Sequence, residues 1–133
     1  MRIGIDKIVE QAIKQVETEL PERARHASVA LRNATLEVLR GTRTGRVYRT
    51  PRGGRYTASA PGEPPAPRTG TLRRSWRPVV SGNNPAIESN VQYAGYLEYG
   101  TSKMARRPYE EKTVDLATPH IQRIYSRPYK IRL

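Results

Sequence analysis

The residues of this sequence that could take part in catalysis are few and widely spaced. The two histidines, His26 and His120, belong to no metal-binding motif. Asp115 lies five positions before His120, which would put the two side chains on different faces of a helix. Cysteine is absent, which excludes disulfides and thiolate metal sites. We therefore predict that the chain is not an enzyme and uses no cofactor or metal.

Two other features resemble parts of an active site but have simpler interpretations. The run Arg52-Gly53-Gly54-Arg55 lacks the lysine and the serine or threonine of a phosphate-binding loop, so its glycines predict a turn. Glu98 could be a lone functional acid. An ion pair between Glu98 and Arg106 or Arg107 is the simpler interpretation.

Positive charge is concentrated in the middle of the chain. The formal net charge is +12, of which residues 1–39 contribute 0, residues 40–80 contribute +9 and residues 81–133 contribute +3. A charge that is focused in this way indicates a surface that faces a negatively charged partner. It does not distinguish DNA or RNA from an acidic protein.

Arginine recurs at every third position from Arg40 to Arg55, and residues 41–70 are rich in glycine and proline. Residues 47–58, with a proline and two glycines at their centre, are typical of a β-hairpin. Neither face of this hairpin is clearly apolar, so little holds it against the chain's own core. We predict an extended arm. Its interface residues are Arg43, Arg46, Tyr48, Arg49, Arg52, Arg55 and Tyr56.

The composition of this arm leaves its partner open. Arginine interleaved with tyrosine is typical of nucleic-acid-binding surfaces, where arginine contacts phosphate and tyrosine stacks on bases. The same two residue types are enriched at protein–protein interfaces. A third interpretation is a solvated loop whose charge only keeps the arm soluble.

Length and composition predict one α+β domain over residues 1–133, with a modest core, because only 36% of the residues are hydrophobic. No apolar run approaches the roughly 20 residues that cross a bilayer, and the first residues lack the apolar region of a signal peptide. We therefore expect a soluble protein that is made in the cytoplasm and does not bind membranes.

The N-terminal part, residues 1–40, is predicted to be one long helix. Apolar residues recur at steps of three and four from Ile5 to Val38, which makes a single stripe along a helix. Pro21 interrupts the pattern, so the alternatives are two helices or one kinked helix. We favour the kinked helix because the stripe keeps its phase. Such a helix is long for a small domain and would project or pack against a neighbour.

Residues 71–125 are predicted to form a small antiparallel sheet and further helices. Two strands, 78–81 and 86–92, are expected on either side of the turn G-N-N-P at 82–85, and a short helix at 94–99 is expected to end at Gly100. A C-terminal helix is expected to begin at Arg107-Pro108 and to be interrupted by Pro119, with Val114, Ala117, Ile121 and Ile124 on its buried side. Residues 126–133 are expected to be a basic extended tail.

Two passages resemble signatures of a known family. Residues 59–76 read S-A-P-G-E-P-P-A-P-R-T-G-T-L-R-R-S-W, and the second passage spans residues 93–109. The first passage is similar to the proline-rich approach and the motif R-T-G-x-L-R-x-S of small minor tail components of long-tailed bacteriophages, also called neck or tail-completion proteins. The matching residues of both passages are Arg68, Gly70, Leu72, Arg73, Ser75, Tyr93, Tyr96, Glu98, Tyr99, Gly100, Thr101, Met104, Arg107 and Pro108.

The resemblance covers the chain from about Ile8 to Ile121 and implies structural work in the virion neck after synthesis in the host cytoplasm. Proteins of this kind form rings in the connector between portal and tail tube, with sixfold symmetry favoured here and twelvefold symmetry as the alternative. The implied partners are copies of the chain, neighbouring connector, tail-terminator or tail-tube proteins, and DNA in the channel. No small-molecule substrate is implied. We also expect Tyr93, Leu97, Tyr99 and Met104 to pack between sheet and helices.

Overall fold

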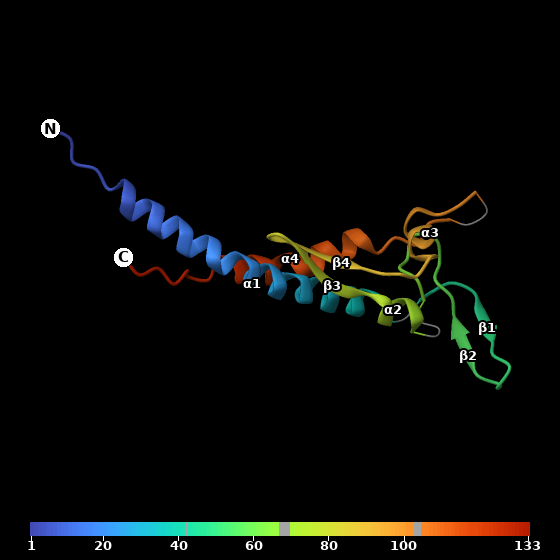
Figure 1. Ribbon diagram of the computed structural model, residues 1–133. Coiled ribbons are helices and arrows are strands. Elements are labelled where there is room, and N and C mark those ends of the chain that lie inside the picture. The colour runs from blue at the N-terminus through green and yellow to red at the C-terminus, as the bar shows by residue number, and fades with distance from the viewer. Residues whose placement is uncertain (42, 67–69, 103–104) are drawn as a thin grey trace.

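An elongated α+β molecule, dominated by one long helix, is shown by a computed structural model that describes residues 1–41, 43–66, 70–102 and 105–133 (Figure 1). The predicted fold class is therefore confirmed. The elements are α1 (Asp6–Val38), β1 (Val47–Arg49), β2 (Arg55–Thr57), α2 (Thr71–Ser75), β3 (Arg77–Ser81), β4 (Asn84–Glu88), α3 (Ala94–Tyr99) and α4 (Glu110–Ser126).

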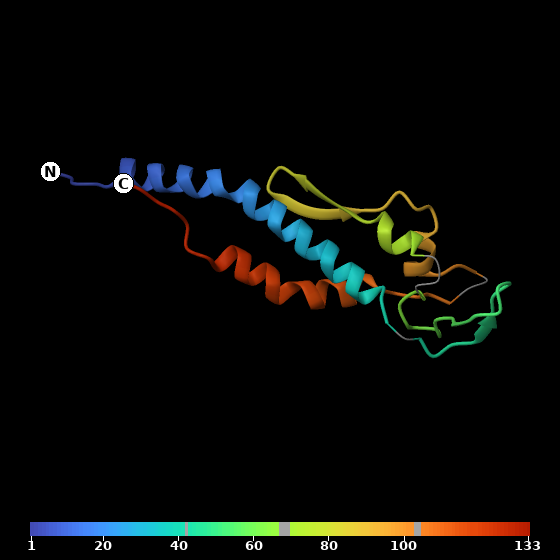
Figure 2. The same ribbon diagram turned by 90° about the horizontal axis from the view of Figure 1, so that it is seen from below.

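Helix α1 runs without a break through Pro21. Its axis changes direction along its length (Figure 2), as expected where a proline ring removes one backbone hydrogen bond. The prediction of a single kinked helix is confirmed. At 1.5 Å per residue its 33 residues span about 50 Å, which is long for a chain of this size.

The body of the molecule has three layers, with α1 in the middle. The hairpin β3–β4 covers one side of α1, and α4 runs along another side (Figure 2). The two strands pair in antiparallel register from Arg77↔Glu88 to Ser81↔Asn84, so residues 82–83 form a tight turn. The predicted antiparallel pair is confirmed, although β4 is shorter than the sequence pattern implied.

The core is built from small side chains. Ala24, Ala27 and Ala117 are completely buried, and the hydroxyl residues Ser28 and Thr35 are nearly so. The buried hydroxyls donate to backbone carbonyls one turn earlier, Ser28 to Arg25 and Thr35 to Leu31, so their polar atoms are satisfied. Small residues let α1 and α4 approach closely, and they leave most of the large apolar side chains nearer the surface.

Helix α4 differs from the prediction in two respects. It begins at Glu110 rather than at residues 107–108, and it continues through Pro119 to Ser126. The helix tolerates Pro119 because this residue and Asp115, whose carbonyl loses its donor, are both exposed to water, while Ala117 packs against the core.

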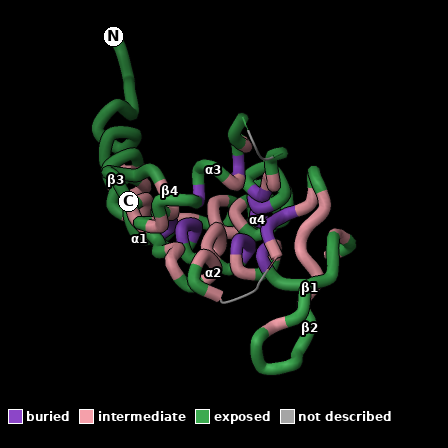
Figure 3. Tube along the Cα trace, turned by 90° about the vertical axis from the view of Figure 1, so that its right-hand side faces the viewer, coloured by how far each residue is buried: buried purple, intermediate pink, exposed green. Residues whose placement is uncertain are grey.

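The buried side of α4 also differs from the prediction. Val114 is exposed, Ile121 and Ile124 are half-buried, and Thr113 is buried beside Ala117. Most buried residues lie where α1, α2, α3 and α4 meet, and Pro64 and Pro65, which follow the hairpin β1–β2, are buried as well. The tip of that hairpin and the N-terminal end are exposed (Figure 3).

Candidate interaction surfaces

The predicted arm is a two-stranded hairpin at the end of the molecule opposite the termini (Figure 1). Strands β1 and β2 pair from Val47↔Thr57 to Arg49↔Arg55. Tyr48 and Tyr56 stack with ring centroids 5.3 Å apart, and Arg46 lies 5.2 Å from the centroid of the Tyr48 ring. The aromatic pair gives the hairpin an internal contact that does not depend on the body.

The charge on the arm is uncompensated. Arg46, Arg49, Arg52 and Arg55 are exposed, and none of them forms an ion pair with another described residue. Arg49 and Arg55 lie directly opposite each other across the hairpin, an arrangement in which like charges destabilise the pair. The arm therefore carries a cost in isolation that a negatively charged partner would relieve.

Arg43 differs from the other predicted arm residues, because it lies at the root of the arm and points inward. Its guanidinium donates to the backbone carbonyls of Val38 at 2.9 Å and of Pro64 at 2.8 Å, and it also reaches the carbonyl of Pro65. Burial lowers the pKa of this guanidinium. Pro64 and Pro65 are themselves buried. Arg43 thus ties these two prolines to the end of α1, and together they form the base of the arm.

Glu63 and Gly45 complete this base. One carboxylate oxygen of Glu63 accepts hydrogen bonds from the backbone N–H groups of Ala60 and Thr44 and from the Thr44 hydroxyl. The backbone hydrogen bonds, Ala60 first, hold the pKa of Glu63 below its ordinary value. Gly45 passes so close to Ala58 that a Cβ atom would lie 2.5 Å from the Ala58 carbonyl oxygen. Only glycine fits there.

The first signature passage holds α2 against α1. Arg73 donates to the carbonyl of Leu36 in α1 at 3.1 Å. Ser75 lies 2.6 Å from the hydroxyl of Ser89, which links α2 to the segment after β4. Leu72 is half-buried, and Gly70, with φ of 76°, precedes the helix. The signature residues Arg68 and Met104 lie outside the described residues.

In the second passage, Glu98 is buried and binds the start of α4. Its Oε2 atom accepts hydrogen bonds from the backbone N–H groups of Tyr109 at 2.7 Å and Glu110 at 3.1 Å. A carboxylate at this place satisfies free donors of the first turn and interacts favourably with the helix dipole. The predicted ion pair with Arg106 is present at 3.9 Å. Glu98 therefore positions α4, and this contact explains why α4 begins at Glu110.

Three neighbours extend this junction between α3, α4 and the arm. Arg107 donates to the hydroxyl of Ser59 at 2.9 Å, which ties the segment before Pro108 to the root of the arm. Gly100 ends α3, as predicted, with a φ of 76° that a β-branched residue would adopt only under strain. Tyr109 is buried, and its hydroxyl donates to the carbonyl of Ala94. Burial is the main cause that raises the pKa of this hydroxyl, and the negative charge of Glu98 is the second.

The other signature tyrosines point outward. Tyr93, Tyr96 and Tyr99 are 43%, 55% and 75% exposed, so the expectation that Tyr93 and Tyr99 pack inside is wrong; Leu97 is half-buried as expected. Because these tyrosines are spaced by three residues, they lie on one side of α3. The opposite side of the helix, with Ala94 and Glu98, faces the interior. Thr101 is exposed beside them. This tyrosine surface lies at the same end of the molecule as the arm (Figure 1).

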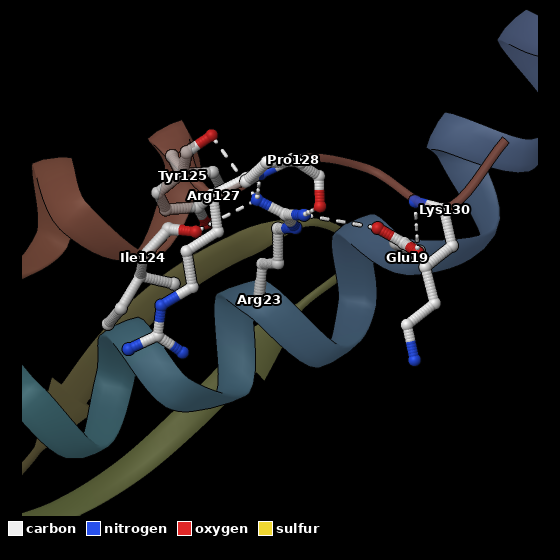
Figure 4. A network of polar contacts seen from close by, with 7 residues as sticks. All are labelled: Glu19, Arg23, Ile124, Tyr125, Arg127, Pro128 and Lys130. Carbon is white, nitrogen blue, oxygen red and sulfur yellow. Dashed lines mark hydrogen bonds and ion pairs between the residues drawn. The ribbon is translucent and has the colours of Figure 1, made fainter.

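One densely bonded residue, Arg23, was not singled out by the sequence. Arg23 is buried and donates to the carbonyls of Ile124, Arg127 and Pro128 at 2.9, 2.7 and 3.0 Å and to Glu19 at 3.1 Å (Figure 4). Its guanidinium also stacks 3.6 Å from the centroid of the Tyr129 ring. A cation at the C-terminal end of α4 satisfies carbonyls that have no partner within the helix.

The predicted basic tail is bound along α1. The amide side chain of Gln15 bonds both the N–H and the carbonyl of Arg132, at 2.6 and 2.7 Å, and Glu19 accepts from the N–H of Lys130. The bond from Lys130, above all, lowers the pKa of Glu19. One signal could have revealed this anchor: Arg23 falls inside the apolar stripe of α1, between Leu20 and Ala27, where an unpaired charge would be costly.

A cavity of about 340 Å³ lies where α1, α3 and α4 meet, with Trp76, Tyr109 and Glu98 in its lining, and the described residues offer the Trp76 indole N–H no acceptor. Within the described part of the chain, no group of three or more acidic or histidine side chains could hold a metal ion. No helix in that part is long and apolar enough to cross a bilayer.

Comparison with protein families, curated proteins and solved structures finds no match to this chain.

Proposed function

We propose that the chain is a structural subunit of the connector that joins the DNA-filled head of a long-tailed bacteriophage to its tail. The observation that carries this proposal is the exposed surface, 9868 Å². A compact monomer of 15.1 kDa exposes about 7,100 Å². Subunits of rings bury such an excess on their neighbours.

The arrangement of the exposed parts supports the same proposal. A basic arm and an apolar helix end project from opposite ends of one rigid body (Figure 1). Copies that contact each other through two different surfaces form a closed ring when the rotation between them closes. We favour a sixfold ring, with a twelvefold ring as the alternative, in the neck of the virion. The neighbours would be connector, tail-terminator or tail-tube proteins, and the proposal includes no catalytic step, cofactor, membrane or small-molecule substrate.

In this proposal the arm contacts the acidic surface of a neighbouring protein. The variant that tests it reverses Arg46, Arg49 and Arg52 to glutamate in the phage that encodes the chain. We expect the purified variant to keep its helix content and melting temperature, because these side chains contact little of the body. Electron microscopy should show filled heads and complete tails that fail to join.

A triple lysine variant at the same three positions is the matched control. It keeps the charge, so joining should be reduced far less than by glutamate. Normal infectious particles from the glutamate variant would refute the role of the arm. Absence of the chain from purified virions, measured by mass spectrometry, would refute the connector function itself.

Binding of the arm to nucleic acid is the second candidate, favoured by exposed arginines that pair with no described carboxylate. Four phosphate contacts would reduce the affinity for duplex DNA about 10²-fold when salt rises from about 50 to 200 mM. Fluorescence anisotropy with a labelled duplex measures this dependence. Failure to bind duplex at low salt would eliminate this candidate and leave the protein partner.

A further inference from the structure

The N-terminal half of α1 lacks the partner that its sequence pattern calls for. Ile5, Ile8 and Ile13 are 62%, 48% and 51% exposed, and Val9 is similarly exposed. This half extends beyond β3–β4 and α4 (Figure 2). The C-terminal tail follows it along one edge only, through the Gln15 and Glu19 contacts.

This bare face continues a face that is packed elsewhere in the molecule. The stripe that begins at Ile5 continues at helical spacing to Ala24 and Ala27, which are completely buried against the rest of the body. The difference between the two halves arises because α4 ends at Ser126 and the chain continues as an extended tail. The exposed half of α1 therefore has the pattern of a packed helix.

A groove of about 310 Å³ between α1 and α4 offers a matching surface. Its apolar side chains include Val29 of α1 and Leu116 of α4, which are 42% and 37% exposed. The charged and imidazole side chains of the lining are mostly basic, with Glu37 as its one carboxylate. The basic and imidazole side chains are His26, His120, Arg123 and Arg127. In Figure 4 the guanidinium of Arg127 is turned away from Arg23.

The charges on the two surfaces are complementary. Glu10 and Glu17 lie two helical turns apart along one edge of the apolar stripe. Neither forms an ion pair with a described residue, whereas Glu19 and Glu22 pair with arginines of their own helix. Arg123 and Arg127 lie one turn apart on α4 and likewise form no ion pair within the described ranges.

We propose that the N-terminal half of α1 of one copy packs into the α1–α4 groove of a second copy. Ile8 and Ile13 contact Val29 and Leu116, and the acidic edge of the helix faces Arg123 and Arg127. Stripe and groove are different surfaces of the same chain, so the contact is head-to-tail and repeats from copy to copy. It specifies how subunits meet in the ring, and in that respect it rests on the proposed function.

Cysteine cross-linking tests this contact directly, because the natural chain has no cysteine. Ile13→Cys and Leu116→Cys are introduced separately and together. Residue 13 lies about 24 Å along α1 from Val29, which shares the groove with Leu116, so the two thiols of one chain cannot meet. Under mild oxidation we expect the double variant to form a ladder of disulfide-linked dimers, trimers and larger oligomers. A mixture of the two single variants should form disulfide-linked dimers and nothing larger.

Thr18→Cys combined with Leu116→Cys is the control, because Thr18 is exposed on the opposite side of α1 from the stripe. It should form no ladder. Homodimers of Ile13→Cys alone would mean that two stripes pack on each other and would overturn the proposal. Absence of any cross-link at sub-millimolar concentration of the double variant would overturn it as well.

Charge reversal gives a second, independent readout. Glu10→Arg with Glu17→Arg should weaken self-association about tenfold, and Arg123→Glu with Arg127→Glu in the partner should restore it. If the second pair does not rescue the first, the predicted orientation is wrong. If the chain forms the cross-linked ladder but is absent from virions, the contact is supported and the connector function is refuted. If the chain is present in virions but forms no ladder, the connector function is supported and the contact is refuted.

Discussion

Arg23 and Arg49 show how differently this molecule uses the same residue type. Arg23 is buried in α1 and bonds three backbone carbonyls at 3.0 Å or less, one carboxylate and one aromatic ring. Arg49 is exposed on β1, opposite a second arginine and without an acidic partner among the described residues. The charge of Arg23 is fully paired within the chain, whereas the charge of Arg49 is paired with no described residue.

Net charge alone does not predict whether a basic segment is bound to the body of the molecule. The tail and the arm are both basic, and both were expected to be extended segments. The tail is bound to α1 because its backbone meets Gln15, Glu19 and Arg23. The arm has bonded contacts at its root, around Arg43 and Glu63, and none of this kind reaches its arginine-rich tip. The arginines of the tip therefore form no ion pair with any described residue of the chain.

The largest expected effect is the loss of the buried arginine. Arg23→Met should destabilise the fold by about 3 kcal/mol, because the carbonyls at the end of α4 lose their donor and Glu19 loses its partner. Urea unfolding followed by circular dichroism measures the change. Arg25→Met is the matched control, since Arg25 is exposed and pairs only with Glu22, and it should cost less than about 0.5 kcal/mol. Equal effects of the two substitutions would contradict the distinction between buried and exposed arginines.

A second pair of variants tests whether the root of the arm is rigid. Gly45→Ala should destabilise the protein by about 1–3 kcal/mol, because the new methyl group would overlap the Ala58 carbonyl. Gly95→Ala, in α3, meets nothing within 4 Å and should stabilise it by about 0.5–1 kcal/mol. Thermal unfolding gives both signs in one experiment. If Gly45→Ala leaves the melting temperature unchanged, the backbone at the root of the arm can shift to make room for the methyl group.

The root should also respond to acid. Because the pKa of Glu63 is lower in the folded chain than its ordinary 4.5, the unfolded chain binds more protons in that range. The contribution of Glu63 is therefore present above pH 4.5 and is lost as the pH falls through the folded pKa. Glu63→Gln should flatten the fall in melting temperature over this interval. An unchanged slope in Glu63→Gln would contradict this role of Glu63.

The smallest effect is expected within the arm itself. Arg49→Thr removes the cross-strand pair of like charges and should stabilise the hairpin by up to about 0.5 kcal/mol. Amide hydrogen exchange at Val47 and Thr57 reports the change as slower exchange. Arg46→Thr should not slow exchange, because it removes a charge that lies over the Tyr48 ring. Faster exchange in Arg49→Thr would show that Arg49 stabilises the hairpin.

Local patterns were sufficient for much of the fold. The apolar spacing of α1, the hairpin 47–58 around its glycines, the turn between β3 and β4 and the end of α3 at Gly100 were all predicted and are all present. Each depends on contacts between residues close in sequence, or on a backbone conformation that a single residue type prefers. Tyr93 and Tyr99 were wrongly predicted to be buried, because spacing alone does not say which side of a short helix faces the interior.

The sequence by itself determined the long amphipathic helix, the hairpin arm and the charge that the arm carries. Only the tertiary structure decided which arginines are anchored: Arg23 meets carbonyls about a hundred positions later, and Arg43 meets carbonyls some twenty positions later. A guanidinium can satisfy any carbonyl that comes within reach, so its role depends on which distant backbone folding brings to it. At the tip of the arm folding brought no such backbone from the described residues, and the charge remains exposed.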